Sequence, residues 1–124
     1  MSRAGKSLSG LARLASLRSD LEMRRFSALL AHVEAARARI EGLERELRSN
    51  YQTDHAFSVE AARLANALAG ECSRSLVQAE QDLQKILPSY HEARQSAVRE
   101  FGRKTAIEAI GKASVRKETP TKPR

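Results

Sequence analysis

The chain has few of the residue types on which compact folds and reactive centres depend. Its 124 residues include no Trp, 4% aromatic residues, three Pro and one Cys. A single cysteine excludes an internal disulfide, and its place in an apolar row of the sequence indicates a core thiol. No apolar run approaches the ~20 residues that cross a bilayer, and charges at Arg13, Arg18 and Asp20 exclude a secretory leader. We therefore expect one domain in a reducing cytoplasm.

Patterns that hold metals or carry out catalysis are absent as well. None of His32, His55 and His91 lies four residues from another His, so a metal site is not indicated. The net charge of +7 is spread as +4 over residues 1–50 and +3 over residues 51–124. No motif that reads a nucleic-acid groove accompanies it, and aromatic side chains for base stacking are scarce. We expect a protein with no catalytic activity and no cofactor, which binds nucleic acid only non-specifically through basic residues near its C-terminus.

The residues that are plentiful, Ala, Leu, Arg and Glu, are typical of long helices and coiled coils. Apolar residues recur at steps of mostly three and four in two stretches. The first comprises Leu8, Leu11, Leu14, Leu17, Leu21, Phe26, Leu29, Val33, Ala36, Ile40, Leu43 and Leu47. The second, read backward, comprises Phe101, Ala97, Ala93, Tyr90, Leu87, Leu83, Ala79, Leu76, Cys72, Leu68, Leu64 and Ala61.

Paired in that order, the residue numbers sum to 107, 108 or 109, from Leu8 with Phe101 to Leu47 with Ala61. A nearly constant sum is what an antiparallel pair requires, although any two rows of similar period can be phased to within a residue or two. The pattern predicts an all-α fold, a long antiparallel two-helix coiled-coil hairpin. Its helices occupy about 8–49 and 58–113 within a single domain, 1–113, and are joined by a turn at about 50–57.

Three local features complete the predicted fold. Either Asp54 or Ser58 caps the second helix. Pro88 costs an interior helix ~3 kcal/mol, so we expect a kink there, with a three-helix bundle broken at Pro88 as the alternative. Phe57 is expected to close the turn, whereas Tyr51 either does the same or contacts a partner. Residues 114–124 are predicted to be a disordered basic tail.

Two sets of apolar residues are left over by this pairing. The first set lies in the chain from Arg103 onward. Because Gly102 would lie opposite Lys6, this part of the chain would project past the first helix, unless residues 1–7 are also helical and cover it. A second set lies outside the predicted seam and either improves core packing or docks another protein or a second copy. Its members are Met23, Leu30, Val77 and Ile86.

Two segments resemble a known family. Residues 97–110 read Ala-Val-Arg-Glu-Phe-Gly-Arg-Lys-Thr-Ala-Ile-Glu-Ala-Ile, and residues 11–18 read Leu-Ala-Arg-Leu-Ala-Ser-Leu-Arg. With the two-helix form, they make the chain similar to the FliJ-type coiled-coil proteins of bacterial flagellar and type III protein export. In form they also resemble the coiled coil of the ATP synthase gamma subunit.

The resemblance implies a cytoplasmic protein peripheral to a membrane-bound export apparatus. It would bind the hexameric export ATPase through the end that carries both termini, promote ring assembly or activity, and have the export gate or export chaperones as further partners. The residues implied in ATPase binding are Leu8, Leu11, Arg99, Phe101, Arg103, Lys104, Ile107 and Ile110. A homo-oligomerising structural coiled coil and a basic nucleic-acid-binding accessory protein remain the alternatives.

Overall fold

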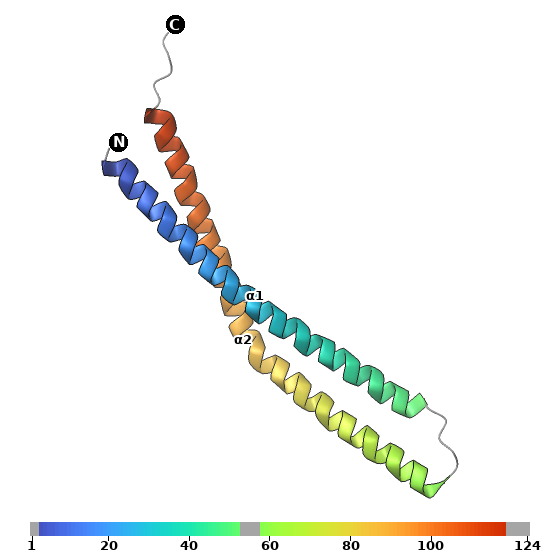
Figure 1. Cartoon of the computed structure of the whole chain (residues 1–124). Helices are drawn as coiled ribbons and strands as arrows, with labels where there is room; N and C mark the ends of the chain where they lie inside the picture. The colour runs from blue at the N-terminus through green and yellow to red at the C-terminus, as the bar shows by residue number, and fades with distance from the viewer. Residues whose placement is uncertain (1–2, 53–57, 119–124) are drawn as a thin grey trace. The chain divides into compact units, whose positions relative to one another are not determined.

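The computed structural model describes residues 3–52 and 58–118, which form two α-helices (Figure 1). Helix α1 spans Arg3–Gln52 and helix α2 spans Val59–Glu118, and no strand occurs in these ranges. The predicted all-α, two-helix hairpin is confirmed. Both helices are longer than predicted, because α1 begins at Arg3 and α2 continues past Ala113. Residues 114–118 of the predicted tail are therefore helical, and residues 119–124 lie outside the described part.

Ser58 begins α2 as its N-cap. Its Oγ accepts a hydrogen bond from the backbone N–H of Ala61 at 3.0 Å, and its carbonyl accepts one from Ala62 at 3.0 Å. These bonds satisfy N–H groups that have no partner within the first turn of a helix. Of the two predicted caps, Ser58 is the one the structure shows; Asp54 and Phe57 lie outside the described residues.

Helix α2 continues through Pro88 without interruption. The alternative of a three-helix bundle broken at this residue is therefore wrong, and the kink stays a prediction. Proline cannot donate to the carbonyl four residues earlier, which costs the helix a hydrogen bond. The neighbouring residues are packed: Leu87 and Tyr90 are half-buried and Ala93 is fully buried.

The chain divides into two compact units, and each helix contributes to both. Residues 29–90 form the hairpin unit, which contains the connection between the helices. Residues 1–28 and 91–124 form the terminal unit, which contains both chain ends. In each unit a segment of α1 lies antiparallel to a segment of α2 (Figure 1). In the terminal unit Arg25 of α1 and Glu92 of α2 form an ion pair at 3.9 Å across the helices.

The core of the hairpin unit consists of Val33, Ala69, Cys72 and Ala79. The Cys72 thiol donates a hydrogen bond to the carbonyl oxygen of Leu43 at 3.4 Å. This contact places Cys72 beside Leu43. The predicted pairing placed Cys72 beside Ala36, which lies seven residues, or two helical turns, before Leu43. The predicted register is thus wrong, although the predicted burial of Val33, Cys72 and Ala79 is confirmed.

The seam of the terminal unit is built from small side chains, not from leucines. Ala15, Ser19, Ala93 and Ala97 are its buried residues. Methyl and hydroxymethyl groups let two helices approach closely, whereas a leucine at the same position would hold them apart. The predicted seam leucines are exposed by 51%, 47%, 55% and 64%, and we call them the leucine row: Leu11, Leu14, Leu17 and Leu21. Their prediction as core was wrong, as it was for Leu64, Leu68 and Phe101.

Neither helix contains a segment long and apolar enough to cross a membrane, over the residues that the structure describes.

Candidate interaction surface

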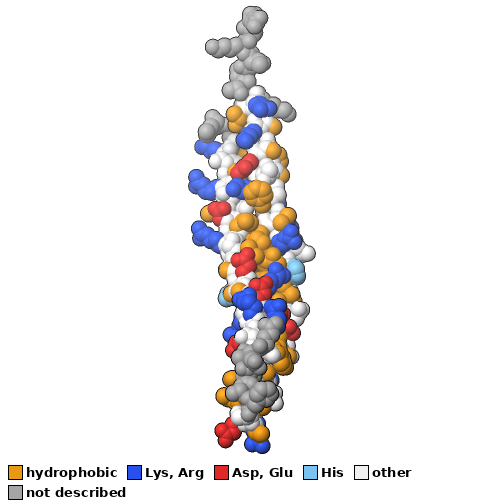
Figure 2. All heavy atoms as spheres, turned by 90° about the vertical axis from the view of Figure 1, so that its right-hand side faces the viewer, with side chains coloured by type: hydrophobic (Ala, Val, Ile, Leu, Met, Phe, Trp, Pro, Cys, Tyr) orange, Lys and Arg blue, Asp and Glu red, His pale blue; other side chains and the backbone are white. Residues whose placement is uncertain are grey.

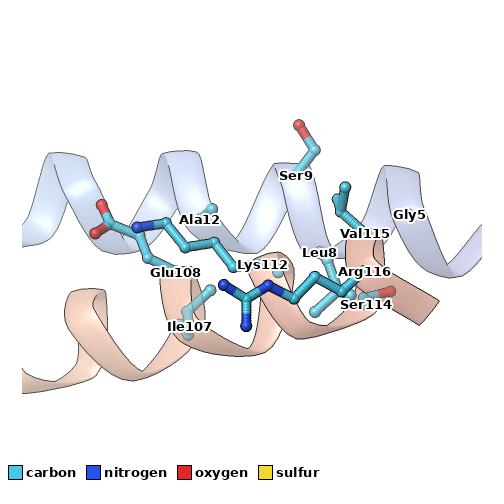
Figure 3. A pocket seen from close by; sticks show the side chains of 11 residues that line it. Gly5, Leu8, Ser9, Ala12, Ile107, Glu108, Lys112, Ser114, Val115 and Arg116 are labelled. Carbon is cyan, nitrogen blue, oxygen red and sulfur yellow. The ribbon is translucent and has the colours of Figure 1, made fainter. Parts of the chain in front are cut away.

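A groove of about 610 Å³ opens in the terminal unit, between the first turns of α1 and the last turns of α2 (Figure 3). Its apolar walls are Leu8 and Ala12 of α1 with Ile107 and Val115 of α2. The predicted overhang is therefore wrong. Residues 3–7 are helical, as the alternative held, and α1 lies beside the last turns of α2.

The shape of the groove follows from two glycines in its wall. Gly5 on α1 and Gly111 on α2 present no side chain there, and a Cβ at Gly111 would meet no atom within 4 Å. Figure 3 shows Leu8 and Ile107 between the two helices, with the Lys112 side chain extended along α2 toward Glu108. The result is an apolar trough with charged groups at its rim.

The terminal unit also exposes large apolar side chains along α2. Phe101, Ile110 and Val115 are each exposed by more than half. Hydrophobic side chains are likewise open to solvent between charged ones in Figure 2. Val115 lines the groove, whereas Phe101 and Ile110, nine residues apart, lie on opposite sides of α2. All eight residues that the resemblance implied in binding belong to this unit, and Leu8 and Ile107 line the groove itself.

The basic residues implied in binding make local interactions along α2. Arg99 donates to Ser96 Oγ at 3.3 Å, and Arg103 pairs with Glu100 at 3.0 Å. The Lys104 ammonium lies 6.0 Å from the centre of the Phe101 ring. Neighbours at this spacing contribute only a few tenths of a kcal/mol. Such weak restraints leave the three cations available to an incoming anionic group.

Charge is divided unequally between the two units. By sequence the terminal unit has 15 Lys and Arg against 6 Asp and Glu, a net +9, whereas the hairpin unit has 7 against 9, a net −2. Dividing the sequence at residue 50 conceals this difference, because each half contributes to both units. The terminal unit thus carries all of the chain's excess positive charge.

The second predicted face does not belong to a single unit. Met23 is part of the terminal unit, whereas Leu30, Val77 and Ile86 are part of the hairpin unit. Leu30 and Ile86 are half-buried, which agrees with a packing role. Val77 is exposed and lines a groove of about 690 Å³ with Ile40 and Leu83. Tyr51, the predicted contact near the turn, is exposed by 73%.

Reactive groups are sparse among the described residues, which contain no cluster of His, Cys, Asp and Glu able to hold a metal ion. Burial raises the pKa of the Cys72 thiol, and the negative charge of Glu46 raises it further. A thiol that stays protonated near neutral pH is a poor nucleophile. The chemistry of Cys72 is therefore that of a packing residue.

Both units have a groove and exposed apolar side chains, and the positive charge distinguishes the terminal unit as the candidate interaction surface. Sequence reasoning placed the eight implied residues near one another, but it missed Gly111 and Val115 and assigned the exposed leucine row to the core. Alanine and serine at steps of three and four, as at Ala12, Ala15 and Ser19, were the available signal for the true seam. Comparisons of the chain with protein-family models, with curated proteins and with solved structures found no match.

Proposed function

We propose that the chain is a non-enzymatic component of a bacterial flagellar or type III export apparatus. In this proposal it resides in the cytoplasm beside the membrane-bound machine. Its terminal unit binds the hexameric export ATPase and promotes assembly or activity of the ring. The segments 11–18 and 97–110, which resemble FliJ-type proteins, suggest the partner.

The observation that carries the proposal is the coincidence of charge and exposed apolar surface on one unit. The terminal unit has a net charge of +9 and an open groove, whereas the hairpin unit has −2. A cationic surface accelerates encounter with an acidic partner and aligns it before contact. The apolar groups beside it then supply the buried area that holds the complex.

Individual residues have distinct roles in this proposal. An apolar side chain of the ring enters the groove between Leu8 and Ile107. Phe101 and Ile110, both more than half exposed, act as anchors that are buried on binding, and aromatic residues are common among such hot spots. Arg103 and Lys104 face acidic groups of the ring.

Two leucine substitutions test the role of the groove. Gly111→Leu would fill it, and Gly10→Leu adds the same side chain to the terminal unit outside the groove. A Cβ meets no atom within 4 Å at either position, so both variants should fold. The purified export ATPase of the source organism would be titrated with each chain, measuring both the Kd and the rate of ATP hydrolysis.

We expect the wild type and Gly10→Leu to bind the ATPase and raise its turnover. Gly111→Leu should bind at least about tenfold more weakly, the effect of one lost hot spot. An ATPase that neither binds nor responds to the wild-type chain would refute the proposed function. Equal binding of all three chains would instead exclude the groove as the contact.

A further inference from the structure

The leucine row is a second apolar feature of the terminal unit, and the groove does not use it. Its four residues follow one another at steps of three, three and four, so they lie along one side of α1. The buried residues Ala15 and Ser19 occupy a different side, which packs against α2. The row therefore forms an unpartnered apolar stripe about three turns long, or ~15 Å at 1.5 Å per residue.

Arginines border this stripe. Arg18 lies four residues after Leu14 and three before Leu21, and Arg24 lies three residues after Leu21; residues at these spacings are neighbours on a helix. Arg18 and Arg24 are exposed, as is Arg13 at the other end of the row. Asp20, exposed and three residues after Leu17, is the one acidic side chain at these spacings. The stripe thus combines exposed leucines with a mainly cationic border, on the unit with a net charge of +9.

We propose that the leucine row binds an acidic amphipathic helix of a partner protein, which adds a third helix to the terminal unit. Leucines at steps of three and four match a partner with apolar residues at i, i+3 or i+4, and i+7. Glu or Asp beside the partner's apolar face would meet Arg13, Arg18 and Arg24. This contact does not rest on the ATPase proposal: it shares only Leu11 with the residues implied in ATPase binding and lies on a different side of α1 from the groove.

Two other occupants fit the stripe less well. A second copy placed row against row would bring arginines opposite arginines and two strongly positive units together, which charge complementarity disfavours. A helix that lies in a membrane interface buries a continuous apolar face and keeps its charged residues on the opposite face. In α1 the exposed Arg18 lies between Leu14 and Leu21 within the row, and the side that holds Ala15 and Ser19 is occupied by α2.

The probe is a fluorescein-labelled synthetic helix with Leu at the a and d positions of its heptads and Glu at the flanking positions. A second peptide, identical except for Lys in place of each Glu, controls for charge. Binding to the full chain is followed by fluorescence anisotropy at increasing salt. The variant Leu14→Ser/Leu21→Ser removes two leucines of the row. Its matched control, Leu64→Ser/Leu68→Ser, changes two leucines of the hairpin unit with similar exposure, 62% and 48%.

We expect the acidic peptide to bind the wild type and the hairpin-unit control with equal affinity, more weakly as salt rises. Leu14→Ser/Leu21→Ser should raise the Kd by about 100-fold, or tenfold for each hot-spot residue. All four leucines are exposed, so circular dichroism should show unchanged helix content.

Three results would overturn the proposal. The first is equal binding of the acidic and basic peptides, and the second is equal loss in the two double variants. The third is failure of the acidic peptide to bind, together with evidence that the row binds something else. That evidence would be dimerisation in sedimentation velocity, or binding to phosphatidylglycerol vesicles, which the wild type shows and Leu14→Ser/Leu21→Ser loses.

Discussion

The register of the hairpin unit can be tested by forming a disulfide. The Cys72 sulfur lies 3.4 Å from the carbonyl oxygen of Leu43, so Leu43→Cys would place a second sulfur close to it. A disulfide requires Cα atoms within about 7 Å of each other. Ala36→Cys is the matched control, because the pairing of apolar rows in the sequence places Ala36, not Leu43, opposite Cys72.

The expected difference between the two variants is large. Ala36 lies seven residues before Leu43, ~10 Å along the helix at 1.5 Å per residue, which is beyond the reach of a disulfide. Leu43→Cys should therefore oxidise to an intramolecular crosslink, whereas Ala36→Cys should keep two free thiols. Closing a loop of some 30 residues should also stabilise the oxidised Leu43→Cys chain by roughly 3–4 kcal/mol on the chain-entropy estimate.

The assay is oxidation by copper phenanthroline at low protein concentration and alkaline pH, where the Cys72 thiol ionises more readily. The crosslink would be quantified by free-thiol titration and located by mass spectrometry of tryptic peptides, and urea unfolding would measure its effect on stability. The wild type, with one cysteine, shows the background of intermolecular products. Efficient crosslinking of Ala36→Cys, with none in Leu43→Cys, would refute the register described above.

Three further predictions concern the cap, the seam and the thiol. Ser58→Ala should lower the free energy of unfolding by about 1 kcal/mol in urea, because the N–H of Ala61 loses its acceptor; Ser58→Asn should preserve stability, and equal losses would contradict the cap. Ala93→Leu should destabilise by about 1–3 kcal/mol through overpacking, whereas Leu21→Ala should change stability by less than ~0.5 kcal/mol; the reverse order in thermal melts would show that leucines form the seam. Because the pKa of the Cys72 thiol is raised in the folded chain, the unfolded chain releases this proton first, and the stability of the wild type relative to Cys72→Ala should fall as pH rises above the ordinary thiol pKa; a difference that does not vary between neutral pH and pH ~10 would contradict this.

The existence of two helices could be predicted from composition and periodicity, because Ala, Leu, Arg and Glu at steps of three and four suit no other element over such lengths. The cap at Ser58 was also among the predictions. The register was not predictable by the same means. Aligning the largest apolar residues assumes that they are buried, and in the terminal unit that assumption selects the leucine row in place of Ala15 and Ser19.

For the candidate interaction surface, the grouping of its residues was predictable, but the shape of the groove was not. The resemblance gathered its residues toward the chain ends, and the structure places all eight in the terminal unit. The groove depends on the true register, since only this brings Leu8 beside Ile107 and Gly111. The charge difference between the units was hidden for the same reason, because it appears only once residues 1–28 are grouped with residues 91–124.

The small-residue seam has a thermodynamic consequence for the response of the terminal unit to salt. Alanine loses no side-chain entropy on burial, but it buries little apolar area, so both the heat capacity of unfolding and the dependence on denaturant should be low for this unit. A net charge of +9 adds self-repulsion that a thin core opposes weakly, and dissolved ions screen that repulsion. Raising the ionic strength should therefore have two opposite effects. It should stabilise the unbound terminal unit against opening, and it should slow the association of this unit with an acidic partner.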